Sequence, residues 1–194
     1  MELNLRSRHV RRIHLDFDLS LEFDDGSTVA FSEFSVDGVV YDEDNQFEGL
    51  RRVVELSGAA CTSAEISNDG GLLIEFDDGT SVSAAPRAEV ESWEFTGADG
   101  ALVVCLAGGE VETNDATSHS SPPSPVPGAI AEGSTVVRLT VGRGGGIEFS
   151  NGSVLPIEVP LHDAYLILRE TVVSVVRSDG AVQVKLSSGL RLQR

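Results

Sequence analysis

Hydrophobic and polar residues alternate along residues 15–23, which read LDFDLSLEF. Leucine and phenylalanine occupy every odd position, and polar residues occupy every even one. A period of two predicts a half-buried antiparallel strand. The run ends at residues 24–26, Asp-Asp-Gly, which is typical of a hairpin turn, and the apolar pattern resumes at residues 27–31. The pattern therefore predicts a β-hairpin here.

The same turn unit occurs again along the chain. EFDDGS at residues 22–27 returns as EFDDGT at 75–80 and, more loosely, as EFSNGS at 148–153. The spacings between the copies are unequal, which excludes a solenoid of fixed period. Two explanations stay open, namely repeated use of a favourable turn in an antiparallel sheet, or an old duplication. Further Asp-Gly turns at 69–70, 99–100 and 179–180 each precede a predicted strand.

One helix is predicted, over residues 45–57. Its apolar residues, Phe47, Leu50, Val53 and Val54, form a helical stripe, and Asn45 with Glu48 resembles a capping box. Residues 161–176 are ambiguous. Their β-branched composition favours strands with a turn near 169–170, and a short helix over 161–168 is the alternative.

Three regions differ in composition. Residues 112–133 are rich in proline and serine and have no apolar period, which predicts a disordered linker. Residues 1–111 are predicted to form an antiparallel β domain with one helix, and residues 134–194 a small β domain of about four strands. The predicted fold class is therefore mainly β, a β-rich α+β protein. A domain as small as the second is marginal alone, so we expect it to pack on the first domain or on another subunit.

The charge of the chain is strongly asymmetric. The formal net charge is −17, with −16 carried by residues 1–111, −3 by residues 112–133 and +2 by residues 134–194. Binding to nucleic acid or to anionic membranes needs clustered Lys and Arg, so both roles are disfavoured. The charge instead favours a basic protein partner.

The sequence contains no recognisable catalytic, metal or cofactor motif. The four histidines are scattered, the two cysteines have neither disulfide-framework nor zinc spacing, and no nucleophile elbow occurs. The glycine-rich residues 142–146 lack the GK[ST] ending of a phosphate loop. We therefore expect a protein that is not an enzyme and has no cofactor. Two reduced thiols and the lack of a signal sequence or an apolar membrane span predict a cytoplasmic location.

Acidic residues gather at three places that could contact a partner. They lie on the first predicted strand, on two hairpin tips and just before the predicted helix. The candidate partner-binding residues are Asp16, Asp18, Glu22, Asp24, Asp25, Asp42, Glu43, Asp44, Asp77 and Asp78. A plain solvated face is the alternative interpretation. A basic cluster, Arg6, Arg8, Arg11 and Arg12, is expected to pair with carboxylates across the sheet, with an anion-binding patch as the alternative.

Residues 10–112 resemble a family of small uncharacterised proteins common in actinobacteria. The resemblance rests on the FDDG hairpin, on the segment PRAEVESWEFTG at 86–97, and on the GGE ending at 108–110. The family has no assigned activity, and the resemblance implies that Trp93 packs in the core beside the last hairpin.

Two functions fit these observations. The first is an acidic binding protein, such as an inhibitor or an immunity protein, that covers a basic surface of a toxin or nuclease. The second is a scaffold module whose near-neutral second domain assembles into a homo-oligomer. An enzyme that uses surface carboxylates is a weaker third reading.

Overall fold

The structure is a computed structural model, and it describes residues 1–15, 18–41, 49, 52–114, 129–142, 145–156, 167, 170–178 and 181–193. The chain divides into two compact units, residues 1–120 and 121–194. The division falls inside the segment for which the sequence predicts a linker. The predicted linker, residues 112–133, is wrong at its ends, because residues 112–114 belong to the strand Val111–Asn114 and Ile130 is buried. Residues 115–128 lie outside the described residues, so their disorder stays a prediction.

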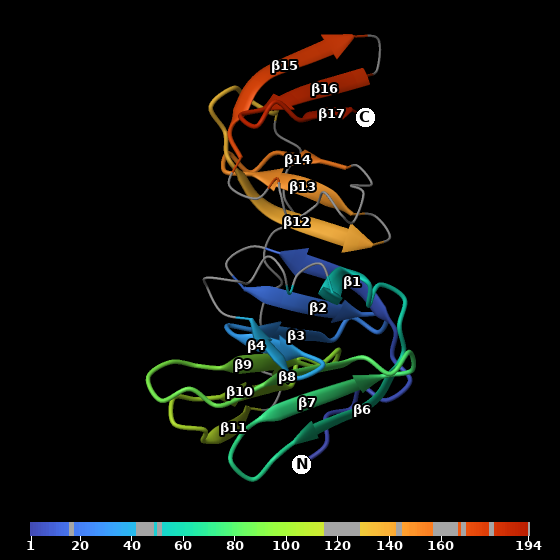
Figure 1. Cartoon of the computed structure of the whole chain (residues 1–194), viewed down its shortest axis with the longest axis vertical. Helices are drawn as coiled ribbons and strands as arrows, with labels where there is room; N and C mark the ends of the chain where they lie inside the picture. The colour runs from blue at the N-terminus through green and yellow to red at the C-terminus, as the bar shows by residue number, and fades with distance from the viewer. Residues whose placement is uncertain are drawn as a thin grey trace. The chain divides into compact units, whose positions relative to one another are not determined.

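The first unit contains two antiparallel sheets (Figure 1). The first sheet has the strand order β11-β10-β9-β3-β2-β1 within this unit. Its strands are β1 (Val10–Leu15), β2 (Leu19–Phe23), β3 (Thr28–Phe31), β9 (Trp93–Thr96), β10 (Leu102–Cys105) and β11 (Val111–Asn114). The second sheet has the order β5-β4-β8-β7-β6. Its strands are β4 (Phe34–Val36), β5 (Val39–Tyr41), β6 (Cys61–Ile66), β7 (Leu72–Phe76) and β8 (Ser81–Ala84).

The core of the first unit follows from the alternation of the strands. Leu19, Leu21 and Phe23 of β2 have no exposed surface, and neither does Ile74 of β7 in the other sheet. Each sheet thus buries one face, as in a β-sandwich. The indole Nε1–H of Trp93 in β9 donates to the carbonyl of Gly70, in the turn before β7, at 2.9 Å, which ties the two sheets together. The expectation that Trp93 packs in the core is confirmed.

Residues 15–23 form two strands, so the prediction of one continuous strand is wrong. Leu15 at the end of β1 pairs with Leu19 at the start of β2, so the chain reverses between them. Because Leu15 and Leu19 pair directly across the two strands, their side chains lie on the same face of the sheet. Two residues four apart in one continuous strand would also lie on the same face, so both arrangements give the same alternation. The period of two therefore continues through a reversal that it does not reveal.

The predicted helix, residues 45–57, is described only in part. Residues 49 and 52–54 are helical, but residues 55–57 form a turn, so the helix ends three residues before the predicted end. Residues 45–48, 50 and 51 are not described. The fold is thus β-rich with one short helix, and every strand pairing within either unit of the described part is antiparallel, which confirms the predicted fold class.

The second unit contains two three-stranded arrangements. They are β12 (Val136–Gly142), β13 (Gly146–Phe149) and β14 (Val154–Leu155), and β15 (Val172–Ser178), β16 (Ala181–Leu186) and β17 (Arg191–Gln193). The described residues therefore hold six strands rather than about four. β14 and β17 are two and three residues long, which is too short for a period to appear. The end of the ambiguous segment belongs to β15, as favoured, whereas residue 167, inside the bounds of the helical alternative, is in a helical turn. Residues 161–166, 168 and 169 lie outside the described part, so the choice between strand and helix over 161–168 stays open.

A bulged three-stranded meander occurs four times, as β1-β2-β3, β6-β7-β8, β12-β13-β14 and β15-β16-β17. In the first strand of each, the pairing register skips one residue, at Val10/Arg12, Cys61/Ser63, Val136/Arg138 and Val172/Ser174. The residue before each bulge joins the two meanders of a unit through an isolated bridge, His9 to Ala60 and Thr135 to Thr171. The repeat covers the whole meander and its junction, well beyond the turn, which favours duplication over reuse of a turn.

The repeated turn explains the repeated sequence. In the first copy, the Gly26 N–H donates to the Phe23 carbonyl and the Phe23 N–H to the Ser27 carbonyl. Gly26 has a φ of +92°, which favours glycine. This is a type I turn closed by a glycine bulge, a common hairpin connection. Gly79, with the same hydrogen bonds around it and a φ of +85°, repeats it in the second sheet.

Candidate functional site

The predicted acidic residues divide into three groups in the structure. Asp16, Asp42, Glu43 and Asp44 lie outside the described residues. Asp18 is exposed in the connection between β1 and β2. The remaining five, Glu22, Asp24, Asp25, Asp77 and Asp78, lie at or beside hairpin turns, and each has a partner inside the protein.

Two of these acids pair with the basic cluster, and a third pairs with His9. Arg8 Nε lies 3.0 Å from Asp25 Oδ2, and Arg12 Nη1 lies 3.2 Å from Glu22 Oε1. Asp24 lies 3.3 Å from His9 Nδ1. The expectation that the basic cluster pairs with carboxylates across the sheet is thus confirmed for Arg8 and Arg12, whereas Arg6 lies 3.7 Å from Glu2, four residues away in sequence. Such partly exposed pairs contribute about 0–1 kcal/mol each, so their main effect is to neutralise this patch.

The hairpin-tip aspartates also accept backbone hydrogen bonds. Asp25 accepts from the Ser27 N–H, and Asp78 accepts from the Thr80 N–H, both at 2.9 Å. Asp77 accepts from the N–H of Ala60, the bridge residue between the two meanders, at 2.9 Å. These carboxylates therefore stabilise the turns and the junction, in addition to any contact with a partner.

A different surface of the first unit carries acids that face solvent. We call it the acidic face: the outward side of the second sheet, made of Ser35, Val40, Ser63, Glu65, Leu73, Glu75, Ser81 and Ser83. Glu65 and Glu75 are exposed, and Val40 and Leu73 expose 56% and 40% of their surface. None of the strand residues of this face is basic. Apolar and anionic groups are thus mixed on one flat sheet surface.

Small polar side chains form the floor of the acidic face. The hydroxyls of Ser35 and Ser83 lie 2.6 Å apart across β4 and β8, and Ser63 donates to the Glu75 carboxylate at 2.6 Å. These short serine side chains have hydrogen-bond partners within the sheet, so they do not project far from its surface. A partner can therefore approach the sheet closely between Leu73 and Val40.

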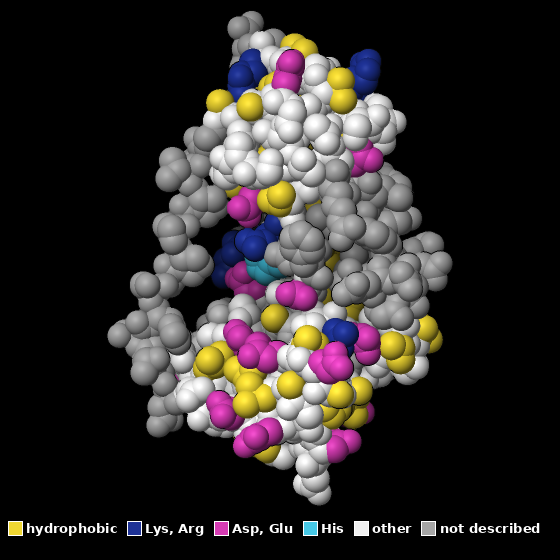
Figure 2. Space-filling view, turned by 90° about the vertical axis from the view of Figure 1, so that its left-hand side faces the viewer, with side chains coloured by type: hydrophobic (Ala, Val, Ile, Leu, Met, Phe, Trp, Pro, Cys, Tyr) yellow, Lys and Arg dark blue, Asp and Glu magenta, His cyan; other side chains and the backbone are white. Residues whose placement is uncertain are grey.

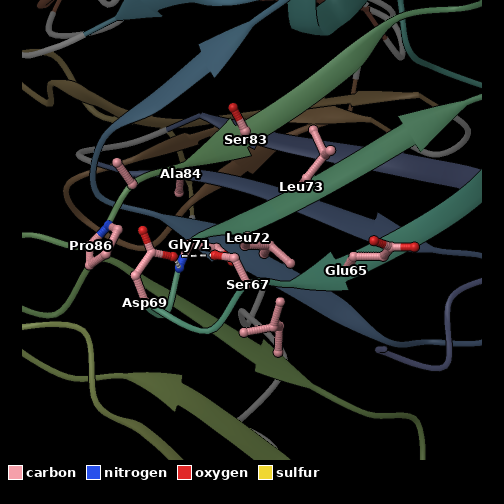
Figure 3. A pocket seen from close by; sticks show the side chains of 11 residues that line it. Glu65, Ser67, Asp69, Gly71, Leu72, Leu73, Ser83, Ala84 and Pro86 are labelled. Carbon is pink, nitrogen blue, oxygen red and sulfur yellow. Dashed lines mark hydrogen bonds between the residues drawn. The ribbon is translucent and has the colours of Figure 1, made fainter. Parts of the chain in front are cut away.

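A pocket of about 330 Å³ lies at one end of the acidic face (Figure 3). Leu73 and Ser83 project into it from neighbouring strands, with Glu65 on one side and Asp69 on the other. Hydrogen bonds from the Ser67 hydroxyl and the Gly71 N–H lower the pKa of Asp69. The pocket thus combines an apolar wall with two carboxylates, and the Asp69 carboxylate stays ionised at neutral pH.

Sequence reasoning missed Glu65, Asp69 and Glu75 as site residues. The signal was present, because residues 72–76, LLIEF, follow the same alternation as residues 19–23 and place positions 73 and 75 outward. Runs of neighbouring aspartates at turns drew the prediction to the hairpin tips instead.

A family profile described as "Family of unknown function (DUF6188)" matches residues 1–115. The chain belongs to DUF6188. Comparisons with curated proteins and with solved structures find no match. The DUF6188 match ends one residue after β11, so it contains every strand of the first unit and the whole acidic face. The expectation of a family without an assigned activity is confirmed, and the second unit lies outside the match.

Two features are absent from the part of this DUF6188 chain that the structure describes. No group of three or more His, Cys, Asp or Glu side chains there could hold a metal ion. No helix in the same residues is long and apolar enough to cross a membrane.

The two cysteines of the DUF6188 chain are free and buried, at Cys61 in β6 and Cys105 in β10. Burial raises the pKa of the Cys61 thiol to about 11, and burial also raises the pKa of Cys105. Only the thiolate attacks disulfides, so both thiols should react slowly in the folded protein.

We expect an aromatic disulfide reagent at pH 8 to label Cys61 of the native protein about a hundredfold more slowly than it labels the unfolded chain. The measurement is the time course of absorbance from the released thiolate, with and without denaturant. Equal rates in the two conditions would contradict the buried placement of the thiol.

Proposed function

We propose that this chain is a non-enzymatic binding protein that covers a basic surface of a protein partner in the cytoplasm, as an inhibitor or immunity protein does. The observation that carries the proposal is the acidic face. It joins exposed carboxylates, exposed apolar side chains and a pocket on one sheet surface with no basic strand residue.

The pocket suggests how a basic partner would be recognised. The aliphatic stem of a lysine or arginine would lie along Leu73, while its charged end reaches Glu65 or Asp69. Complementary charge mainly speeds association and makes binding sensitive to salt. We therefore place the main contacts on the acidic face and assign a supporting role to the hairpin-tip acids.

Replacing Glu65 and Glu75 by glutamine should remove binding of the partner. The full tagged chain would capture proteins from a lysate of the source organism at low and at moderate salt, read by mass spectrometry. We expect wild type to retain one stoichiometric basic polypeptide that moderate salt elutes, and the double variant to lose it. The matched control is Glu89→Gln with Glu91→Gln, two exposed acids outside the acidic face.

The proposal fails if the acidic-face variant and the control retain the same basic polypeptide equally. It also fails if wild type retains none. Neutralising Asp24, Asp25, Asp77 and Asp78 tests the hairpin tips separately, since unchanged association kinetics would remove them from the contact surface. The actinobacterial origin implied by the sequence resemblance is part of the same proposal and fixes the choice of lysate.

A further inference from the structure

The second unit carries a face that corresponds to the acidic face but has the opposite charge. The shared bulge aligns the meander β15-β16-β17 with β6-β7-β8, so that Lys185 takes the place of Glu75. By the same alignment, Arg191 takes the place of Ser81, and Val176 that of Glu65. We call this the basic face: the outward side of β15-β16-β17, made of Ser174, Val176, Gln183, Lys185, Arg191 and Gln193.

The two cations of the basic face lie directly opposite each other. Lys185 pairs in register with Arg191 across β16 and β17, and both are exposed. Neither makes an ion pair with any residue in the described part of the chain. Like charges opposite each other destabilise a sheet, so this arrangement costs stability unless anions come near.

The acidic face shows the complementary arrangement. Glu65 lies opposite Glu2 through an isolated bridge, Arg6 lies 3.7 Å from the Glu2 carboxylate, and Glu75 is the next outward acid. Exposed apolar side chains accompany both charge groups, Val40 and Leu73 on one face and Val173 and Val176 beside the other. The two faces therefore carry opposite charges, and both lie on sheets built from the same kind of meander.

We propose that the acidic face of one copy of this chain binds the basic face of a second copy. The inference rests on the acidic face of the proposed function and names a second copy as an occupant of it. The net charges favour this contact between unlike faces, here called head-to-tail. Residues 1–111 carry a net charge of −16, and residues 134–194 carry a net charge of +2. Figure 2 shows one side of the molecule, where magenta groups are spread over the first unit with a few dark blue groups among them, and where the second unit carries both dark blue and magenta groups.

The head-to-tail arrangement has a direct consequence for assembly. Pairing two acidic faces would oppose carboxylates, so a symmetric dimer through that surface is disfavoured. A heterologous contact leaves one acidic and one basic face unused at the ends, so copies form open chains, or rings where the rotation closes.

A charge-swap series tests the proposal on the purified full chain by sedimentation velocity at micromolar concentration in moderate salt. We expect wild type to self-associate. Glu65→Lys with Glu75→Lys should weaken association at least about tenfold, and so should Lys185→Glu with Arg191→Glu. All four changes together should restore association, because the charges are exchanged between faces. Glu89→Lys with Glu110→Lys is the control of equal charge change, at exposed acids outside both faces.

A strictly monomeric wild type would overturn the proposal. So would association that survives either double reversal, or a folded quadruple variant that stays monomeric, with folding checked by circular dichroism. The capture experiment above detects a foreign partner, whereas this series detects only the chain itself. Either proposal can therefore fail while the other stands.

Discussion

Gly70→Ala should cost about 3 kcal/mol or more of the free energy of unfolding. Gly70 has a φ of +90°, and an added Cβ would lie 2.2 Å from the carbonyl oxygen of Gly109. That neighbour is backbone, in the loop before β11, and it cannot rotate away. The change therefore adds a steric clash between two loops to the strain of the left-handed conformation. The measurement is the midpoint of chemical denaturation.

Gly79→Ala provides the matched control for this prediction. Gly79 has a φ of +85°, and nothing lies within 4 Å of the position of its Cβ. Only the conformational strain remains, so the cost should be about 1–2 kcal/mol. Equal losses for the two variants would show that the approach of Gly70 to Gly109 does not constrain the fold.

Trp93→Ala should cost about 3–5 kcal/mol, the second large effect. Trp93 is 2% exposed, is the sole tryptophan, and lies between Phe31 and Cys105 in neighbouring strands. Removing its side chain leaves a large cavity where the two sheets are joined. Far-ultraviolet circular dichroism during denaturation measures the effect without relying on tryptophan fluorescence.

Trp93→Phe separates the hydrogen bond from the packing. Phenylalanine keeps most of the apolar contact but leaves the Gly70 carbonyl without its indole donor. An unpaired buried acceptor costs about 1–3 kcal/mol, so this variant should fall between wild type and Trp93→Ala. A phenylalanine variant as stable as wild type would contradict a role for that hydrogen bond.

The alternation of residue types predicted the β class and several hairpins because burial of one sheet face acts on every second residue. It could not show the reversal between Leu15 and Leu19, since these two residues lie on the same face of the sheet whether the chain continues straight or turns back after three residues. It could not show β14 or β17, because strands this short contain no full period. The repeated glycine turn, in contrast, could be predicted because only the few residues of the turn itself determine it.

The candidate site was predicted less well than the fold. Counting charges correctly placed the acidity in the first region, but it could not tell which carboxylates are already engaged. Asp77 accepts a hydrogen bond from Ala60, a residue distant in sequence, and Glu22 pairs with Arg12 on the neighbouring strand. Those contacts depend on how strands pair, which a count of residues does not contain. The outward positions of Glu65 and Glu75 needed only the period of two.

The meanders also affect the order in which the first unit can fold. Within β1-β2-β3 and β6-β7-β8 each strand pairs with its neighbour in sequence, so only short loops must close. Pairing β3 with β9 aligns Phe31 with Trp93 and must first bring together the ends of residues 32–92. Loop closure costs more entropy as the loop lengthens, and nonlocal pairings form slowly. The meanders are thus local units that can form early, and the strands β9, β10 and β11 that complete the first sheet depend on a late, long-range step.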